Sequence, residues 1–471
     1  MSLDLYNSLS RAAEPFRPLD PANVRVYSCG PTVYNYAHLG NLRAYVFTDT
    51  LARTLRWKGY PLTHVMNITD VGHLQSDADE GADKMEARAR ETGQDIWAIA
   101  RHYTEAFKAN LDDLNITRPT CMPLATDHIA PMIEYAERIA DRHCYLLEAG
   151  LYFDTSTVLD YGRLARSAAD QTEGRIDPVA GKRHPQDFAI WRRSTPGEAR
   201  QMEWPSPWGR GAPGWHLECS VMSRLYLGDR FDIHTGGIDH REIHHPNEIA
   251  QNQAYCACEH TGASFWMHNN FLVERAGKMS KSSGEFLTLQ AVVDRGFHPL
   301  AYRLMCLQAH YRSEMEFSWE GLAAAGTRLK RLVKTVEGLR ASTSNPPSES
   351  GASHVEAMDR AMADDLNTPR AIIALDELLS DRTIAPAQRL YMLGEFDTVL
   401  GLNLTSLTRA HLRVRPATAG LDAAAVEERL AERREARAAK DFARSDTIRD
   451  ELAGAGVEVM DGDQFGWDWR A

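Results

Sequence analysis

The chain has 471 residues, of which 43% are hydrophobic, and its formal net charge at pH 7 is −12. This length exceeds one ordinary domain and predicts about three or four, with enough apolar residues for a sizeable core. The acidic balance argues against non-specific nucleic-acid binding, so any RNA contact has to use a local basic face.

The N-terminal residues lack an apolar run, and no stretch approaches the ~20 apolar residues that a membrane span needs. We therefore expect neither a signal peptide nor a membrane partner. The seven cysteines are an odd number without a tight framework. They indicate reduced thiols and a cytoplasmic location, with some cysteines available as metal ligands.

The first informative stretch joins a predicted strand, 24–27, to a predicted helix, 42–51. Between them lie Cys29, a Gly-Pro break and the run His38-Leu39-Gly40-Asn41. The N-terminus of a helix that follows a strand presents unpaired N–H groups and a favourable dipole to phosphate. His38 could donate to phosphate oxygens there, and Gly40 would let a nucleotide approach the backbone.

Further along, 62–70 has the pattern of a buried strand that ends in polar residues, and 85–112 has helical patterns. Prolines punctuate the entry to the stretch 119–213, in which 151–155 resembles a strand. Because 178–213 is rich in Pro, Gly and Trp, we expect an insertion of irregular structure there.

Alternation of helix and strand then resumes, with a helix at 215–226, a short strand at 231–234 and a helix at 246–255. A nucleotide-type sheet split by a long insertion is the expected result. From about 307 the chain has helical patterns, interrupted by a low-hydrophobicity connector at 341–354, and a short strand is predicted at 457–459.

The strongest phosphate signal is Lys278-Met279-Ser280-Lys281-Ser282-Ser283-Gly284. Two lysines beside small hydroxyls and a glycine suit a loop that grips polyphosphate, because ammonium groups neutralise the charge that grows on a displaced pyrophosphate. By composition alone, the same string describes a solvated surface loop. Its position downstream of His-x-Gly-Asn favours the functional interpretation.

Metal-ligand candidates are His244 and Glu248, which share a helix face at spacing i, i+4, together with Cys219 and Cys29. Spacing alone does not establish that the four meet. The run Cys256-Ala257-Cys258-Glu259-His260 is more compact, but residues i and i+2 of a helix point apart. We therefore expect ordinary thiols at Cys256 and Cys258.

The C-terminal helical stretch alternates Glu and Arg, which usually marks a solvated face with ion pairs. Trp467 and Trp469 either stack on bases or pack the end of a domain. The residues alone favour a solvated face.

Taken together, these motifs resemble the cysteinyl-tRNA synthetase family, which is part of class I of the aminoacyl-tRNA synthetases. The similarity spans nearly the whole chain. It rests on the motifs Cys29 to Tyr34, His38 to Asn41, Asn67 to Asp70, Ser206 to Gly209, Pro213 to Ser220, Asn247 to Gln251, Lys278 to Ser282, Asp365 to Pro369 and the run from Arg433 to Leu452.

The resemblance implies an α/β fold with a Rossmann-like parallel-sheet catalytic domain, split by a connective insertion. A helical domain and a small anticodon-binding domain would follow. The expected bounds are 1–118 and 214–306 for the two catalytic halves, 119–213 for the insertion, 307–410 for the helical domain and 411–471 for the anticodon-binding domain.

The resemblance also implies roles for single residues. It implies one Zn²⁺ held by Cys29, Cys219, His244 and Glu248. Catalysis would use His38, Asn41, Lys278 and Lys281. ATP, with Mg²⁺, would contact those four residues and also Gly40, Gly237 and Asp239. The substrate cysteine would contact Cys29, Gly30, Thr69 and Trp215.

The implied activity is the ATP-dependent activation of L-cysteine and its transfer to the 3′ end of tRNA-Cys, by a chain that we expect to be a monomer. Zinc binds thiolate well, whereas a shape-only pocket rejects the near-isostere serine by just ~10²-fold. A zinc ion that accepts the substrate sulfur would therefore make an editing domain unnecessary.

Some residues depart from the family pattern. Glu242-Ile243 replaces the usual Phe-Pro before the His-His pair, Pro246 stands where many members have Glu, and His73 and His240 add imidazoles near the site. Two alternatives stay open. One is a mycothiol-type ligase that joins cysteine to an aminosugar and is expected to lack the C-terminal portion. The other is a non-catalytic paralogue with a structural zinc.

Overall fold

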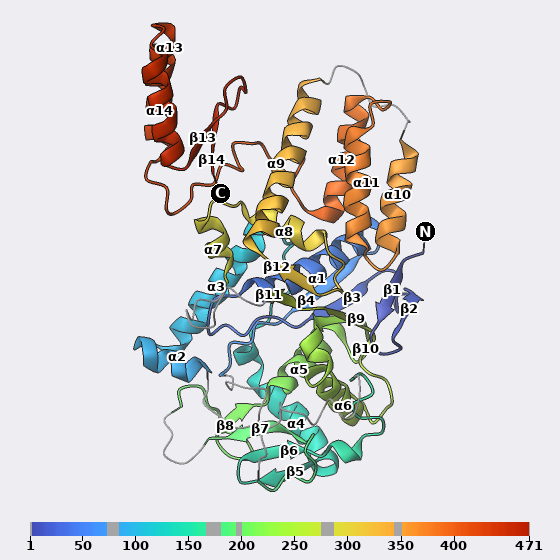
Figure 1. The fold of residues 1–471 in the computed structure, drawn as a ribbon. Helices are drawn as coiled ribbons and strands as arrows, with labels where there is room; N and C mark the ends of the chain where they lie inside the picture. Colours follow the sequence, from blue (N-terminus) through green and yellow to red (C-terminus); the bar gives the residue numbers. More distant parts are fainter. Residues whose placement is uncertain are drawn as a thin grey trace.

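The computed structural model describes residues 2–72, 84–165, 180–194, 200–274, 287–342 and 351–470. At its centre lies a parallel sheet with the order β10-β9-β3-β4 (Figure 1). Its strands are β3 (Val24–Ser28), β4 (Leu62–Met66), β9 (Phe231–Gly237) and β10 (Ala263–Asn269). Two strands precede the insertion and two follow it, so the split parallel sheet expected from the sequence is confirmed.

Helices cover both faces of this sheet, as buried parallel strands require (Figure 1). On one side α1 (Leu39–Trp57) runs from β3 towards β4. Opposite it lie α4 (Ile129–His143), α5 (Trp215–Leu227) and α6 (His244–Cys256). Two further helices, α2 (Lys84–Thr92) and α3 (Ile96–Asp113), lie between β4 and the insertion in the chain.

The insertion is more regular than its composition suggested. It carries an antiparallel sheet with the order β5-β6-β7-β8. Its strands are β5 (Cys144–Leu147), β6 (Gly150–Phe153), β7 (Phe188–Arg193) and β8 (Gly211–Pro213). The expectation of irregular structure over 178–213 was therefore wrong for β7 and β8. Pairing with β6 holds the buried β7 in the sheet, and this tertiary contact overrides the local Pro and Gly content.

Beyond the sheet the chain forms a helical region, as predicted, in which α1 packs against α12. Its helices are α7 (Leu289–Asp294), α8 (Pro299–Leu307), α9 (Trp319–Ala341), α10 (Ala352–Ala363), α11 (Thr368–Ser380) and α12 (Pro386–Leu400). One strand interrupts it, since β12 (Met315–Phe317) pairs in parallel with β11 (Leu272–Glu274).

A buried ion pair joins this helical region to the sheet. Arg303 on α8 is fully buried and donates to the Asp49 carboxylate on α1 at 2.6 Å. The same guanidinium donates to the carbonyls of Leu400 and Leu114. Because a charge is expensive to bury unless it is paired and hydrogen-bonded, this contact ties the orientation of α1 to that of α8 and α12.

The C-terminal region contains α13 (Ala423–Ala438), α14 (Phe442–Gly454), β13 (Val457–Val459) and β14 (Trp467–Trp469). It stands beside α9 (Figure 1). Trp467 and Trp469 are buried in its hydrophobic core, so they pack this region rather than offer faces to bases. Its arginines make ion pairs, such as Arg433 with Asp461, as the alternating pattern predicted.

At the N-terminus, β1 (Asp4–Asn7) and β2 (Ala12–Pro15) form an antiparallel pair. Among the described helices, none has both the length and the apolar composition to cross a bilayer.

Candidate functional site

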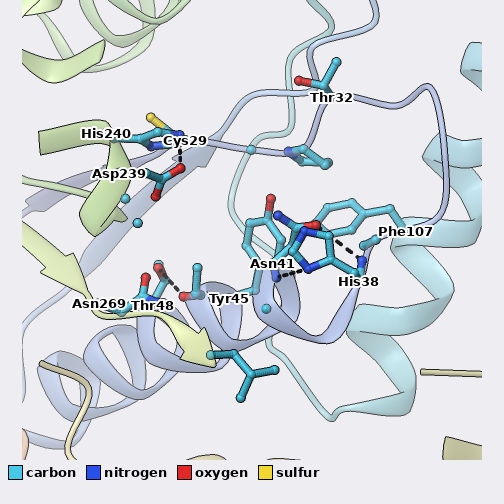
Figure 2. Close-up of a pocket in the computed structure, with 18 of the residues that line it drawn as sticks. Cys29, Thr32, His38, Asn41, Tyr45, Thr48, Phe107, Asp239, His240 and Asn269 are labelled. Atoms are coloured by element: carbon cyan, nitrogen blue, oxygen red, sulfur yellow. Dashed lines mark hydrogen bonds and ion pairs between the residues drawn. The ribbon is translucent and has the colours of Figure 1, made fainter. Parts of the chain in front are cut away.

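A pocket of about 490 Å³ opens where β3, β9 and β10 end and α1 begins. Its lining includes Cys29, Gly30, His38, Gly40, Asn41, Gly237, Asp239, His240 and Asn269. Figure 2 shows Cys29, Asp239 and His240 at one end of the pocket and His38 with Asn41 at the other. The carboxyl ends of parallel strands are where open α/β sheets hold their ligands.

His38 is the N-cap of α1 as well as a pocket residue. Its Nδ1 accepts a hydrogen bond from the Asn41 N–H at 3.2 Å, and its own N–H donates to Asn41 Oδ1 at 3.3 Å. This reciprocal pair satisfies two backbone donors at the helix start. Histidine is not a usual N-cap residue, so this structural role was not expected from the sequence.

The hydrogen bond also sets the tautomer of His38. Burial lowers the pKa of His38, and the nearby Asp239 opposes this only in part, so the ring is neutral at pH 7. A neutral imidazole that accepts at Nδ1 carries its proton on Nε2. His38 is therefore a neutral Nε2–H donor held at the start of a helix.

Gly30 allows the close approach of two strand ends. A Cβ at this position would lie 1.5 Å from the carbonyl oxygen of Asn67, so no other residue fits without moving the backbone. The Gly30 N–H also donates to Asn67 Oδ1 at 2.9 Å. The turn after Cys29 is thus fixed against the segment that follows β4.

Beside the pocket, four potential metal ligands come together from three elements. Cys29 follows β3, Cys219 lies on α5, and His244 and Glu248 lie on α6. Their ligand atoms all lie within 4.8 Å of one another. Cys219, His244 and Glu248 are buried, and Cys29 is half-buried where it lines the pocket. Residue spacing left open whether Cys29 meets the others, and the family resemblance implied that it does.

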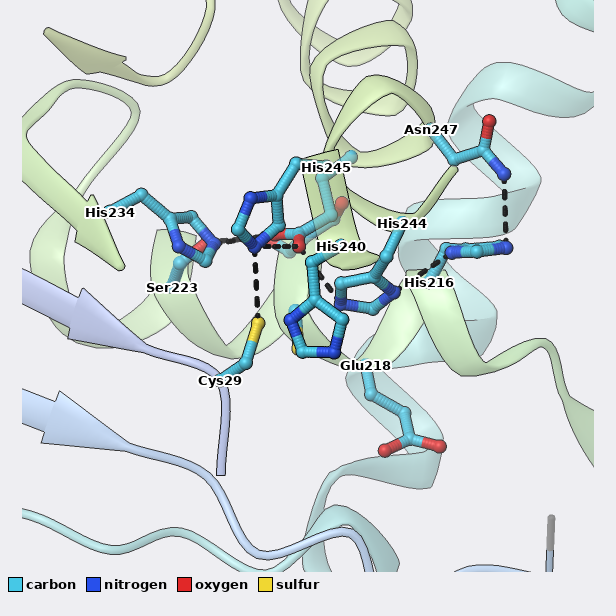
Figure 3. A network of polar contacts seen from close by, with 12 residues as sticks. Cys29, His216, Glu218, Ser223, His234, His240, His244, His245 and Asn247 are labelled. Carbon is cyan, nitrogen blue, oxygen red and sulfur yellow. Dashed lines mark hydrogen bonds and ion pairs between the residues drawn. The ribbon is translucent and has the colours of Figure 1, made fainter. Parts of the chain in front are cut away.

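Imidazoles surround this cluster and orient it (Figure 3). His216 Nδ1 lies 2.9 Å from His244 Nδ1, which leaves the other nitrogen of His244, Nε2, 3.0 Å from Glu248 Oε1. On the other side, His234 Nε2 contacts Glu248 Oε2 at 2.9 Å, and His245 Nε2 lies 3.4 Å from Cys29 Sγ. Cys29, His234, His245 and Glu248 also converge within 4.8 Å, as an overlapping set.

The electrostatics of the cluster favour an anionic carboxylate and thiolate beside imidazole. Burial raises the pKa of Glu248, but His234 and His244 outweigh it and hold that pKa at about 2. A hydrogen bond with Cys29 is the main cause that lowers the pKa of Cys219. Buried anions of this kind require a compensating cation, and His244 is one, because Glu248 and Cys219 outweigh its burial and raise its pKa to about 10.

The donor set fits a metal ion. Glu248 Oε1 is buried, and its close polar contact is with another potential ligand atom, His244 Nε2 at 3.0 Å, so both atoms face the centre of the cluster. Two sulfurs, one imidazole nitrogen and one carboxylate oxygen are ligand types that Zn²⁺ accepts. His216 contacts the nitrogen of His244 remote from Glu248, the position at which an outer-shell partner orients the ring of a metal-bound histidine.

Comparisons with known proteins agree with this geometry. The model of the "tRNA synthetases class I (C) catalytic domain" family matches residues 15–327, and that of the "Cysteinyl-tRNA ligase anticodon binding domain" matches residues 419–470. A cysteine–tRNA ligase of Novosphingobium aromaticivorans is 59% identical over 99% of this chain and 97% of its own length. The chain belongs to the cysteine–tRNA ligase family.

Other relatives agree. A cysteine–tRNA ligase of Zymomonas mobilis is 53% identical over 99% of the chain and 97% of its own length. Among solved structures, a Mycobacterium tuberculosis methionyl-tRNA synthetase in complex with methionyl-adenylate aligns with a TM-score of 0.53 at 15% identity, covering 83% of this chain and 90% of that one. This likeness shows that the class I synthetase fold is shared.

Two residues that were expected to line the cysteine pocket, Thr69 and Trp215, make contacts with neighbouring protein residues. Thr69 Oγ1 donates to Glu218 Oε2 at 2.7 Å and accepts from Asn67 Nδ2 at 3.0 Å. Trp215 stacks on His244 with ring centroids 4.2 Å apart. Both residues lie beside the metal-ligand cluster rather than in the lining of the large pocket, and their contact with cysteine stays a prediction.

Other predicted residues fall into two groups. Gly40, Gly237 and Asp239 line the pocket with His38, although their roles toward ATP stay predictions. Lys278, Lys281 and His73 lie outside the described residues. His240 lines the pocket, 5.0 Å from His244 between ring centroids.

The sequence reasoning missed the supporting imidazoles His216, His234, His245 and His268. His234 ends the predicted strand 231–234, but no strand was predicted around His268, which lies on β10. Their convergence depends on strand register, with His234 opposite Trp266 and His268 opposite Gly236. His268 then reaches His245 at 2.8 Å.

The expectation of two ordinary thiols at Cys256 and Cys258 was wrong, since the structure joins them in a disulfide. In a continuous helix the two side chains would point apart. Instead α6 ends at Cys256, and Ala257 adopts a left-handed conformation with φ 51°. This turn brings the side chains at i and i+2 together.

Proposed function

We propose that this chain catalyses the ATP-dependent ligation of L-cysteine to the 3′ end of tRNA-Cys. Family membership supports the proposal, and the matched anticodon-binding region counts against the aminosugar ligase, which is expected to lack it. The structural observation that carries it is one segment, Cys29 to Asn41. That segment contributes Cys29 to the metal-ligand cluster and His38 to the adjoining pocket.

In the first step a carboxylate oxygen of cysteine attacks the α-phosphorus of ATP. A new oxygen–phosphorus bond forms, the bond to the bridging oxygen breaks, and pyrophosphate leaves with the electron pair. Positioning and charge stabilisation carry most of such a displacement. His38 donates from Nε2–H to a phosphate oxygen, and the N-terminus of α1 adds its dipole. Lys278 and Lys281 supply positive charge to the departing pyrophosphate.

Cys29, Cys219, His244 and Glu248 would hold Zn²⁺ beside this pocket. When bound, zinc supplies a Lewis acid that accepts a thiolate far better than a serine hydroxyl. The residues around it maintain the required protonation states. His234 and His244 keep Glu248 ionised, and His216 orients His244. Gly30, Thr69 and Trp215 would then shape the space that the cysteine occupies.

In the second step the terminal ribose hydroxyl of tRNA-Cys attacks the acyl carbon, and AMP leaves. We infer that residues 307–410 contact the tRNA stem and that residues 411–471 reach the anticodon. The catalytic domain would consist of residues 1–118 and 214–306, with the insertion at 119–213. We further propose that the enzyme acts as a monomer in the cytoplasm and that Mg²⁺ accompanies ATP.

Cysteine-dependent exchange of pyrophosphate into ATP tests the first step. We expect exchange with cysteine but not with serine. If cysteine supports no exchange, the protein would be a non-catalytic paralogue and the proposal would fail. The acceptor is then varied. Transfer to tRNA-Cys supports the proposal, whereas transfer to an aminosugar and not to tRNA would contradict it.

A further inference from the structure

A second group of potential metal ligands lies at the opposite end of α6 from His244. Cys256 is the last residue of α6, and Cys258 and His260 follow it at alternate positions. Potential ligand atoms of these three side chains all lie within 4.8 Å of one another. All three are half-buried, whereas Cys219, His244 and Glu248 of the first cluster are buried.

The backbone makes this convergence specific. Ala257 turns the chain in a left-handed conformation, and the N–H groups of Ala257 and Cys258 both donate to the carbonyl of Gln253, the latter at 3.3 Å. Gln253 Nε2 donates in turn to the carbonyl of Glu259 at 3.0 Å. Gln253 thereby fixes the turn on both sides of Cys258, and the two cysteine Cα atoms lie 5.2 Å apart.

We propose that Cys256, Cys258 and His260, once the cysteines are reduced, form a second site for a thiophilic cation, Zn²⁺ or Cu⁺. Thiolates select such ions, and imidazole suits both. A small cavity of about 10 Å³ borders Cys256 and His260. That is about the volume that one water needs, so a fourth ligand has room.

The three ligands are not equal. The Gly262 N–H donates to His260 Nδ1 at 3.3 Å, so the neutral ring carries its proton on Nε2. Metal binding through Nδ1 therefore displaces this hydrogen bond, and binding through Nε2 requires the ring proton to move to Nδ1. The two thiolates carry the binding, and His260 strengthens it.

The disulfide is the metal-free, oxidised state of the same site. A low-molecular-weight disulfide such as oxidised glutathione accepts the two electrons. The Cys256–Cys258 bond forms, the glutathione disulfide bond breaks, and two glutathione thiols leave with the two cysteine protons. Because one pair of sulfurs serves both states, oxidation and metal binding exclude each other.

Metal content of the reduced, full-length protein tests this proposal. Zn²⁺ and Cu⁺ are each added in slight excess, unbound metal is removed, and bound ions are counted per chain by native mass spectrometry. The wild type should hold one ion more than Cys258→Ser. The matched control Cys144→Ser, which removes another half-buried thiol, should hold as many as the wild type. His260→Gln should still bind, but release the extra ion to a weaker chelator.

Equal ion counts in the wild type and Cys258→Ser would overturn the proposal. The Cys219→Ser variant distinguishes the two sites. Its loss of an ion reports on the cluster of Cys29, Cys219, His244 and Glu248, independently of the result at Cys256 and Cys258. Oxidation gives a readout that needs no variant. Glutathione disulfide should release the extra ion from the wild type, and preloaded metal should protect Cys256 and Cys258 from alkylation. Rapid alkylation of the loaded protein would also refute the site.

Discussion

Two substitutions of His38 separate its structural role from its catalytic one. The ring caps α1 through Nδ1 and would donate to phosphate through Nε2. Asparagine is among the best N-cap residues but has no group in place of Nε2–H. His38→Asn should therefore keep the cap and lose the donor, whereas His38→Ala should lose both.

The magnitudes follow from the two contacts. Loss of an N-cap hydrogen bond costs about 1 kcal/mol. At 3.2 Å and at a half-buried position, the His38 cap should lie near or below that figure. A shift of about 2–4 °C in melting temperature corresponds to 1 kcal/mol for a domain of about 150–250 residues. Loss of one preorganised donor to a developing charge costs roughly 10²–10³ in rate.

The assay is pyrophosphate exchange at saturating cysteine, run beside thermal unfolding. Both variants should lose roughly 10²-fold or more in exchange, and only His38→Ala should melt earlier. Asp422→Ala is the matched control, since Asp422 caps α13 through the Ala425 N–H at 2.8 Å, far from the pocket in the C-terminal region. This variant should lose stability but keep its pyrophosphate exchange activity. Near wild-type exchange in His38→Asn would refute the donor role.

Three further predictions concern other buried groups. Cys219→Ser should raise the KM for cysteine far more than that for ATP in the exchange assay, with loss of an ion from the protein; equal rises would count against thiolate coordination. Burial, and then Arg56, lower the pKa of His64 to about 4, so the unfolded state binds more protons between pH 4 and 6.5 and stability falls as pH drops through that window. By pH 5 this residue alone should cost about 2 kcal/mol in urea unfolding, and His64→Gln should show a shallower decline. Arg303→Met should destabilise by about 3 kcal/mol because it strips Asp49 of a buried partner, while the Asp49→Asn/Arg303→Met double variant should lose less than the sum of the two single changes.

Much of the fold could be predicted because its signals are local. The hydrophobic pattern alone indicates the strand at 24–27 and the helix at 42–51. In the structure these are the longer β3 (Val24–Ser28) and α1 (Leu39–Trp57). The chain order of strands and helices then implies a split parallel sheet. The pairing of β7 with β6 was not predictable in this way, because it depends on residues more than thirty positions away in the chain.

The candidate site shows the same division. The spacing of His244 and Glu248 needs only helix geometry, and both residues do share a face of α6. Cys29 reaches them through the sheet, where its N–H donates to the Thr235 carbonyl at 3.2 Å. No periodicity in the sequence contains that contact. The turn at Ala257 is a converse case, since a single residue in a left-handed conformation invalidated an argument from helix spacing.

The described residues on either side of 275–286, the stretch that contains Lys278 and Lys281, lie near the segment from Cys29 to Asn41. Leu272, in the described residues before that stretch, lines the pocket. After it, the Leu287 carbonyl accepts from the Leu39 N–H at 2.8 Å, next to His38. Both flanks of 275–286 are therefore held beside the pocket. The proposed role of Lys278 and Lys281 toward pyrophosphate requires these flanks to lie beside the pocket, and the Leu287–Leu39 hydrogen bond joins one of them to the first residue of α1.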